Sequence, residues 1–249
     1  MREQHNQKLL ERISQIHQQS HRTYGSPRIW HVLRQEGIRC SRKRIARLMH
    51  IHGIRAKMVR KFKVTTRSRS TQVVAPDLVQ RQFIIHQPNR VWTSDITYIW
   101  TREGWVYLAV VLDLCSRMIV GWEVSSRLTA DLVTNAVERA LYWRRPDENL
   151  ILHSDRGSQY ASTELRSLAK EQMLRLSMGK TGSCYDNAVT ESFFHTLKSE
   201  HIYFHRYDTR QDARTSIFEY IETFYNQQRL HSSLGNRSPM QFELQLTMT

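Results

Sequence analysis

Apolar residues recur at helical spacing in the first fifty residues of the chain. Leu9, Ile13 and Ile16 fall on one face of a helix. The same spacing recurs in segments 24–37 and 38–53, and each segment ends on a glycine, a residue that commonly terminates helices. The pattern predicts three short helices, and the last two, separated by a short turn, predict a helix-turn-helix module.

The second and third helices carry capping and basic residues near their starts. Ser26, which precedes Pro27, and Ser41 are predicted N-caps. Four cations lie on faces of the third helix away from its apolar stripe, and we predict that they contact DNA: Arg42, Lys43, Arg44 and Arg47. The alternative is a solvated face of a small helical domain.

From residue 85 onward, strand and helix patterns alternate. Segments rich in β-branched and aromatic residues predict strands at 90–100, 105–116, 118–126, 149–155 and 174–178. Amphipathic segments predict helices at 129–145, 162–173 and 210–229, with another helix after residue 187. This order predicts an α/β fold with a mixed five-stranded sheet and helices on both faces.

Charge separates the same two parts of the chain, whose net charge is +14. Residues 1–75 contain 18 Lys and Arg against three acids, whereas residues 76–249 contain 19 against 20. This distribution is typical of a phosphate-backbone binder joined to a second domain, and a basic solubilising tail is the alternative. We therefore expect a DNA-binding module at 1–56, a basic linker at 57–84 and a second domain at 85–249.

Three widely spaced cysteines, Cys40, Cys115 and Cys184, predict a reduced protein without a disulfide framework. His17, His21 and Cys40 lack the fourth ligand of a structural zinc site, so zinc is not expected there. No apolar run approaches the ~18 residues of a membrane span, and the N-terminus is polar. We expect a soluble cytoplasmic protein without a membrane partner.

Three acids stand where a folded sheet would bring them together. Asp95 lies inside the first strand, where an unpaired carboxylate is costly to bury. Asp155 ends the fourth strand, and Glu191 lies on the helix after a loop containing Gly and Ser. Clustered carboxylates suit Mg²⁺, and two such ions about 4 Å apart can promote in-line displacement at phosphorus. A salt bridge is the alternative for a single strand acid.

Glu191 shares a helix face with His195 and Lys198. Glu191 and Lys198 are about 10 Å apart along the helix axis, too far for a comfortable direct ion pair. The carboxylate and the ammonium group are therefore expected to serve different contacts.

Five segments carry a resemblance to known families. TSDITY, HSDRGSQY and DNAVTESFFHTLKSE resemble the three motif blocks of the DDE-type transposase and retroviral integrase superfamily, and the 35 residues between Asp155 and Glu191 match its spacing. YGSPRIWHVLRQEGI and FYNQQRLHSSLGNRSP are similar to the OrfB protein of bacterial insertion sequences of family three. The resemblance runs from about residue 9 to residue 243 and implies a ribonuclease-H-like second module.

The resemblance also implies a function. Asp95, Asp155 and Glu191 would be catalytic and would hold two Mg²⁺ ions, which Mn²⁺ can replace, while Lys198 would contact substrate DNA. The implied reaction is nicking of the 3′ ends of an insertion sequence followed by strand transfer. The implied partners are double-stranded DNA, both element ends and target, further copies of the chain on that DNA, and an upstream-frame protein joined to it by a frameshift. The implied location is the bacterial nucleoid.

Two other functions remain open from the sequence. One is a non-catalytic DNA-binding regulator or accessory subunit that acts only with the upstream partner. The other is a nuclease of the same fold specific for RNA–DNA hybrids, which the basic N-terminal module and the block around His231 disfavour. His231 itself has no predicted physical role.

Other polar residues near the acids have structural interpretations. Asp113 should contact Arg117, and Asp186 with Asn187 should cap the helix that follows. Two neighbours of Asp155 are candidates for packing and hydrogen bonding, or for contacts with metal-bound water or a phosphate: His153 and Gln159.

Overall fold

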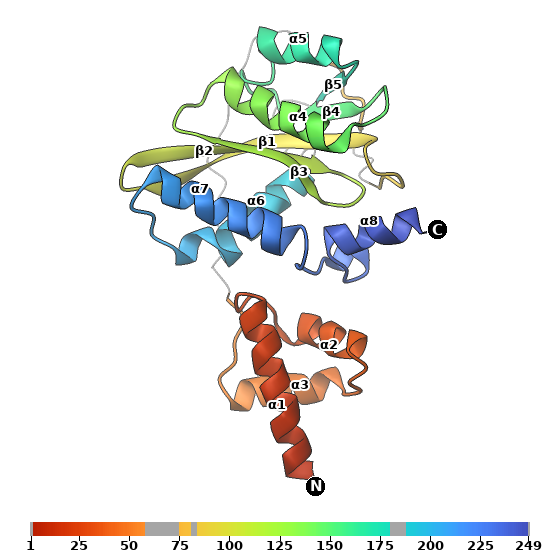
Figure 1. Ribbon diagram of the computed structural model, residues 1–249, viewed down its shortest axis with the longest axis vertical. Helices are drawn as coiled ribbons and strands as arrows, with labels where there is room; N and C mark the ends of the chain where they lie inside the picture. Colours follow the sequence, from red (N-terminus) through yellow and green to blue (C-terminus); the bar gives the residue numbers. More distant parts are fainter. Residues whose placement is uncertain (1, 58–74, 81–83, 180–187, 249) are drawn as a thin grey trace.

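The chain folds into a small helical module and a larger module built on a sheet (Figure 1). The structure is a computed structural model that describes residues 2–57, 75–80, 84–179 and 188–248. Most of the predicted linker, Cys184 and the predicted caps Asp186 and Asn187 lie outside the described residues. The predictions for those positions stay predictions.

Three helices form the N-terminal module: α1 (Arg2–Gln19), α2 (Ser26–Gln35) and α3 (Arg42–Ile51). The predicted apolar stripes of all three helices are buried in one cluster. Ser41 caps α3 as predicted, because its side chain accepts a hydrogen bond from the Arg44 amide. The prediction for Ser26 is wrong: Gly25 already has the extended backbone of a cap, so Ser26 is the first residue of the helix.

The second module contains a five-stranded sheet in the order β3-β2-β1-β4-β5. The strands are β1 (Val91–Thr101), β2 (Gly104–Asp113), β3 (Ile119–Ser125), β4 (Ile151–Ser154) and β5 (Arg175–Met178). The first three form an antiparallel meander, whereas β4 runs parallel to β1 and β5 parallel to β4. The predicted mixed sheet is confirmed, and β1 is the strand at which its antiparallel and parallel halves meet.

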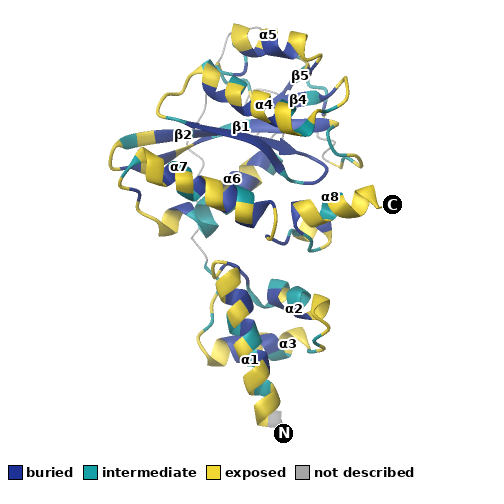
Figure 2. Ribbon diagram, in the orientation of Figure 1, coloured by how far each residue is buried: buried dark blue, intermediate teal, exposed yellow. Residues whose placement is uncertain are grey.

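Helices cover both faces of this sheet (Figure 1). One face packs against α4 (Ala130–Arg144) and α5 (Thr163–Glu171), and the other against α6 (Ala188–Glu200) and α7 (Arg210–Phe218). Figure 2 shows the sheet buried between these layers. The remaining short elements are η1 (Ile202–Phe204), η3 (Ser232–Leu234) and α8 (Pro239–Thr247). None of the described helices is long and apolar enough to span a bilayer.

The helix predicted at 210–229 changes its winding midway. After α7 it continues as a π-helical segment, η2 (Glu219–Tyr225), in which the Asn226 amide donates to the Ile221 carbonyl. The wider turn lets two adjacent pairs of side chains face the core: Tyr220 with Ile221, and Phe224 with Tyr225. Periodicity of 3.6 residues could not predict this, because π-segments depend on the packing of the surrounding core.

Tyr24 and Arg28 fasten the N-terminal module to the sheet module. The Tyr24 hydroxyl donates to the Gln228 carbonyl (3.1 Å) and accepts from the Leu230 amide (2.7 Å). Arg28 of α2 reaches Glu200 at the end of α6 (3.4 Å). One buried phenol therefore satisfies two backbone groups of the segment that follows η2.

Glu200 is the centre of a buried polar cluster that also contains His231. Arg229 donates to both Glu200 carboxylate oxygens at 2.7 Å. Burial, together with the charge of Arg229, lowers the pKa of His231 to about 2. The neutral ring lies with its Nε2 3.4 Å from the Arg229 guanidinium and stacks edge-on against Tyr225. His231, which had no predicted role, therefore supports the arginine that neutralises Glu200.

Gly121 of β3 should not tolerate a side chain. A Cβ atom there would lie 2.7 Å from the Ala140 Cβ and 2.9 Å from its amide nitrogen, so α4 would be pushed off the strand. We predict that Gly121→Ala lowers the free energy of unfolding by about 1–3 kcal/mol, measured by urea denaturation.

Gly25→Ser is the matched control for this prediction. A Cβ at Gly25 meets no atom closer than 3.7 Å, and serine is a good N-cap. Its free energy of unfolding should equal or exceed that of the wild type. Equal stability of Gly121→Ala and the wild type would contradict the close contact between α4 and β3.

Candidate active site

The parallel pairing of β1 with β4 brings two of the three acids to the same level of the sheet. Thr93 of β1 is in register with His153 of β4. Asp95 lies two residues further along β1, and Asp155 lies two residues after His153, immediately beyond the end of β4. The two acids therefore lie near the end of the shared ladder, close enough for the charge of Asp155 to act on Asp95.

The backbone around Asp155 is held in a turn by its own side chain. The Asp155 carboxylate accepts from the Gly157 amide (2.9 Å), an arrangement that reverses the chain after β4. The turn is anchored to β1 by a buried hydrogen bond between the hydroxyls of Tyr160 and Ser94 (2.9 Å). The chain on either side of Asp155 is thus tied to the strand that carries Asp95.

A second hydroxyl pair positions the helix that carries Glu191. Thr190 in the first turn of α6 donates to the Thr93 hydroxyl at 2.7 Å, and both side chains are fully buried. Thr93 precedes Asp95 by two residues, and Thr190 immediately precedes Glu191. The third acid is therefore held at the same end of β1 as the other two.

The three carboxylates disfavour one another's ionisation. Burial, then the charges of Asp155 and Glu191, raise the pKa of Asp95 to about 8, against the effects of the Ile96 amide and Lys198. Burial raises the pKa of Asp155, and burial together with Asp155 raises that of Glu191. Ionisation of these acids is therefore disfavoured, first by burial, and a bound cation would favour their charged forms.

The acids converge without closing into a complete ligand set. Among the described residues, no three His, Cys, Asp or Glu side chains stand close enough to hold a metal ion. The structure thus brings Asp95, Asp155 and Glu191 to one end of the sheet, close enough for their charges to interact.

Lys198 lies between the acids and an aromatic side chain. Its ammonium nitrogen is 4.9 Å from the centre of the Tyr98 ring, and its charge stabilises ionised Asp95. Burial lowers the pKa of Lys198 while Asp95 raises it. No ion pair between Lys198 and Glu191 is found among the described residues, in agreement with their expected separation along the helix.

The other polar residues near these acids have structural contacts. Asp113 is fully buried, and its carboxylate accepts hydrogen bonds from the Trp92 indole and from three backbone amides. It contacts Arg117 as predicted, through a backbone hydrogen bond from the Arg117 amide to the Asp113 carbonyl (2.8 Å). His153 is buried and bonded to the Ser177 hydroxyl (2.9 Å), so packing explains its position. Gln159 is half-buried beside Gly157.

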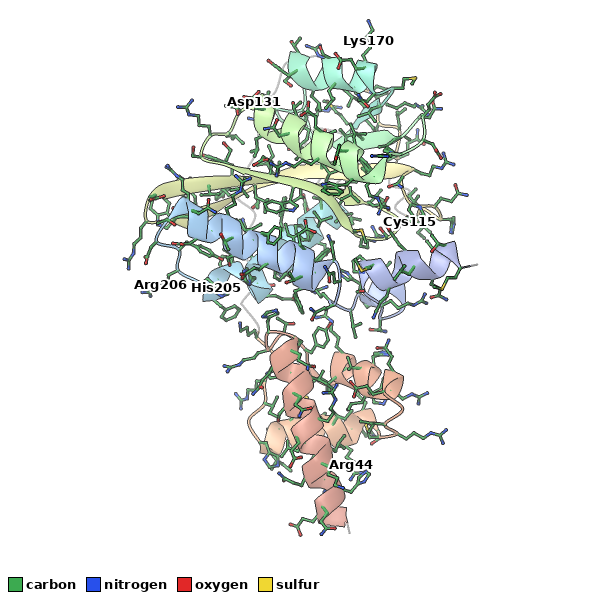
Figure 3. All side chains as sticks on the ribbon, viewed as in Figure 1. Arg44, Cys115, Asp131, Lys170, His205 and Arg206 are labelled. Carbon is green, nitrogen blue, oxygen red and sulfur yellow. The ribbon has the colours of Figure 1, made fainter. Side chains whose placement is uncertain are left out.

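Three of the four cations predicted to contact DNA are exposed on α3: Arg42, Lys43 and Arg47. Arg44, labelled in Figure 3, is different because its guanidinium donates twice to the Asn6 side chain of α1 (2.6 and 3.0 Å). Arg44 therefore braces α3 against α1 in this structure. Sequence periodicity could not reveal that contact, since Asn6 is 38 residues away.

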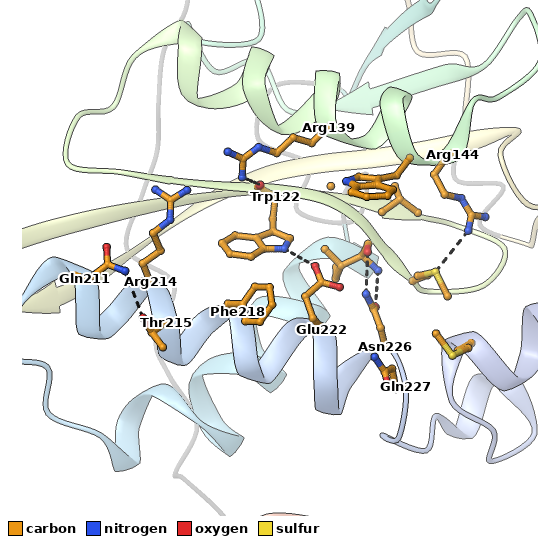
Figure 4. A pocket seen from close by; sticks show the side chains of 16 residues that line it. Trp122, Arg139, Arg144, Gln211, Arg214, Thr215, Phe218, Glu222, Asn226 and Gln227 are labelled. Atoms are coloured by element: carbon orange, nitrogen blue, oxygen red, sulfur yellow. Dashed lines mark hydrogen bonds between the residues drawn. The ribbon is translucent and has the colours of Figure 1, made fainter.

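A large groove on the module lies apart from the acids. It has a volume of about 730 Å³ and runs between the edge strand β3, α4 and the α7–η2 helix (Figure 4). Trp122 and Phe218 lie in it, and the Trp122 indole donates to Glu222 (2.7 Å). Strand β2 separates β3 from β1, so this groove is not the site of the carboxylate cluster.

Neutralising Asp95 should stabilise the protein in the absence of metal. The folded pKa of about 8 lies above the ordinary value of 3.8, so the protonated acid is favoured by folding. The stability contributed by this proton is complete below about pH 4 and is lost as pH rises towards 8. We predict that Asp95→Asn unfolds at least about 2 °C higher than wild type at pH 8 in EDTA.

The same comparison at pH 4 is the control, because both proteins then carry a neutral side chain at this position. The difference in Tm should shrink there. Identical Tm values for wild type and variant at pH 8 would contradict the raised pKa of Asp95 in the folded protein.

The buried hydroxyl pair should be testable by a double-mutant cycle. Thr190→Val leaves the Thr93 hydroxyl buried without its partner, which should cost about 1–3 kcal/mol in the free energy of unfolding. Adding Thr93→Val removes the orphaned hydroxyl, so the double variant should recover part of that loss. Strictly additive single and double effects would show that the two hydroxyls do not interact.

Family models match three segments of the chain. An HTH-like domain matches residues 4–62, and two Integrase core domain models match residues 85–184 and 172–239. The cryo-EM structure of the simian T-cell lymphotropic virus intasome in complex with PP2A regulatory subunit B56 gamma is similar over 92% of this chain and 73% of its own. The TM-score is 0.52 at 15% identity, which supports a shared ribonuclease-H-like fold.

Two bacterial proteins are similar over most of the chain. One is the transposase InsF for insertion sequence IS3A of Escherichia coli K12, 43% identical over 90% of this chain and 78% of its own length. The other is an uncharacterized 31 kDa protein of insertion element IS600 from Shigella sonnei, 43% identical over 97% and 89%. With the acids of its core domain gathered at one end of the sheet, the chain belongs to the transposases of the IS3 family, DDE enzymes with an integrase core domain.

Proposed function

We propose that this transposase nicks the 3′ ends of its insertion sequence and joins them to target DNA, using Asp95, Asp155 and Glu191 as the catalytic acids. The observation that carries the proposal is the pairing of β1 with β4, because Asp95 and Asp155 each follow the last paired residues, Thr93 and His153, by two positions. The Thr93–Thr190 hydrogen bond adds the third. The raised pKa values of Asp95 and Glu191, caused first by burial and then by neighbouring carboxylates, support a site where a bound cation would favour the ionised acids.

The donor set fits hard divalent cations. Three carboxylates offer only oxygen ligands, which Mg²⁺ prefers, and Mn²⁺ accepts the same ligands. Asp95, Asp155 and Glu191 would hold two such ions, which supply Lewis-acid activation of the attacking oxygen and stabilise the leaving oxygen. The protein's part is to hold the acids at one end of β1, and a bound cation would favour the ionised form of Asp95.

DNA is the proposed partner of both modules. Lys198 lies beside the acids with a partly desolvated charge, which suits a phosphate next to the reacting bond. Exposed Arg42, Lys43 and Arg47 on α3 suit phosphate contacts by the N-terminal module. We propose that Arg44 positions α3 rather than reading DNA. At least two copies would act together, because two element ends must be joined.

Replacing any one of the three acids by Ala should abolish cleavage and joining. We predict a loss of at least about a thousandfold, since several kcal/mol of transition-state stabilisation depend on the cations. Binding of the variants to terminal-repeat DNA should stay within about threefold of wild type. The measurement is a strand-cleavage and strand-transfer assay in Mg²⁺ or Mn²⁺, with an EDTA arm that should be inactive.

Glu171→Gln at the exposed end of α5 is the matched control and should retain activity. Metal-dependent joining by an acid variant at the wild-type rate would refute the assignment. If the wild-type chain is inactive alone, the assay is repeated with the chain fused to the upstream-frame protein. Activity found only in that fusion, and lost in the acid variants, would identify this chain as the catalytic part that needs its partner.

A further inference from the structure

Three large aromatic side chains are exposed together at the hairpin end of β1 and β2. Tyr98, Trp100 and Trp105 are 47%, 58% and 44% exposed. Trp100 and Trp105 are directly opposed across the two strands, with ring centres 4.8 Å apart, and Tyr98 meets Trp105 edge-on at 5.1 Å. These three residues are called the hairpin aromatic surface.

Exposed aromatic rings in such a group need an explanation. Further along the same face of β1, Trp92 and Ser94 are buried under α4 and α5. Helices α4 and α5 do not extend over the hairpin end of β1 and β2 (Figures 1 and 2). The side chains of the hairpin aromatic surface, which lie on the same face as Trp92 and Ser94, are therefore exposed to solvent. Contiguous exposed apolar groups of this kind typically mark a binding surface.

The surroundings of the hairpin aromatic surface are basic. A depression of about 560 Å³ joins its rings to Lys198, Arg102 and Arg206, and no Asp or Glu is among the described residues that line it. Lys198 lies 4.9 Å from the Tyr98 ring centre. Arg102 is paired with Asp208 (3.1 Å), whereas Arg206 is exposed at the outer side of the module, beside His205 (Figure 3). Aromatic faces edged by cations match the bases and phosphates of a nucleic-acid strand.

The surface also lies close to the carboxylate cluster along β1. Tyr98 is three residues after Asp95, a distance of about 10 Å along an extended strand, and this odd spacing turns the two side chains to opposite faces of the strand. Lys198 links the two, because its charge acts on Asp95 and its ammonium group lies beside the Tyr98 ring. Among the described residues, no strand pairs with β1 on the β4 side beyond Thr93. A strand of DNA held at the acids would have to pass this edge of β1 to reach the rings, a path of about 10 Å along the strand.

We propose that the hairpin aromatic surface stacks unpaired bases of the DNA strand that is processed at Asp95, Asp155 and Glu191. This inference rests on the proposed function, because it places the surface beside the reacting phosphodiester. In a duplex the faces of the bases are already stacked on one another, so the rings select DNA whose end is frayed or forked. Lys198 and Arg206 then hold the adjoining phosphates.

The test compares binding to two DNA probes by fluorescence anisotropy, with the full chain in EDTA so that no cleavage occurs. One probe is a fully paired terminal-repeat duplex, and the other is the same duplex with its last few bases unpaired. Wild type should bind the forked probe more tightly. Trp100→Ala with Trp105→Ala should weaken binding to the forked probe by about tenfold, since stacking on aromatic side chains contributes strongly per base. Binding to the paired probe should change by less than about twofold.

Two further variants separate stacking from a general defect. Trp100→Phe with Trp105→Phe keeps aromatic faces and should preserve most of the preference for the forked probe. Trp143→Ala removes a 75%-exposed tryptophan from α4 and should leave both affinities unchanged. 2-Aminopurine placed among the unpaired bases should be quenched by wild type and by Trp143→Ala, but not by the double Ala variant.

The proposal is overturned if wild type binds both probes equally, or if the double Ala variant loses affinity for both probes in parallel. It is also overturned if that variant changes only the oligomeric state in size-exclusion chromatography, which would make the surface a contact between copies of the chain. Because binding is measured without metal, these results do not depend on whether the acids catalyse strand transfer. Failure of the acid variants to lose activity would affect the proposed function alone.

Discussion

The pairing of β1 with β4 is the constraint on which the candidate site depends. These two strands are in register over only three residues, from Val91 opposite Ile151 to Thr93 opposite His153. A slip of one residue would turn one carboxylate to the opposite face of the sheet. Much of the surrounding packing therefore serves this register: His153 is bonded to Ser177 on the next strand, and the Tyr160–Ser94 bond ties the turn after β4 back to β1.

Helix α6 connects strand β1 to the C-terminal segment and to the N-terminal module. Its first turn is bonded to β1 through Thr190, and its last turn carries Lys198. Its last residue, Glu200, is neutralised by Arg229 and contacted by Arg28 of the N-terminal module. Burying a carboxylate such as Glu200 requires paired and hydrogen-bonded partners. The cluster at Glu200 therefore fixes one end of the helix whose other end carries Glu191.

Sequence patterns were sufficient for the main helices and strands and for the mixed sheet, but not for η1, η3 and α8. The catalytic role of the three acids stays a prediction. Strong periodicity predicted α1 to α3, and motif spacing identified Asp95, Asp155 and Glu191 before their strands were known to be neighbours. The long-range contacts of the fold could not be predicted. The hydrogen bond between Thr93 and Thr190 joins residues that are 97 positions apart, and the one between Tyr24 and Leu230 joins residues that are 206 positions apart. Local patterns likewise missed the π-segment and the engagement of Arg44 with Asn6, since each depends on which side chains meet after folding.

Asn226 has a consequence for how copies of this protein can associate. Its side-chain amide accepts from the Ile119 amide (2.9 Å) and donates to the Ile119 carbonyl (3.0 Å), the two groups that an added strand would use. An open edge strand is a template for sheet extension. At the start of β3 that template is already occupied by a side chain of the same molecule. A second copy therefore cannot extend the sheet by pairing with the start of β3.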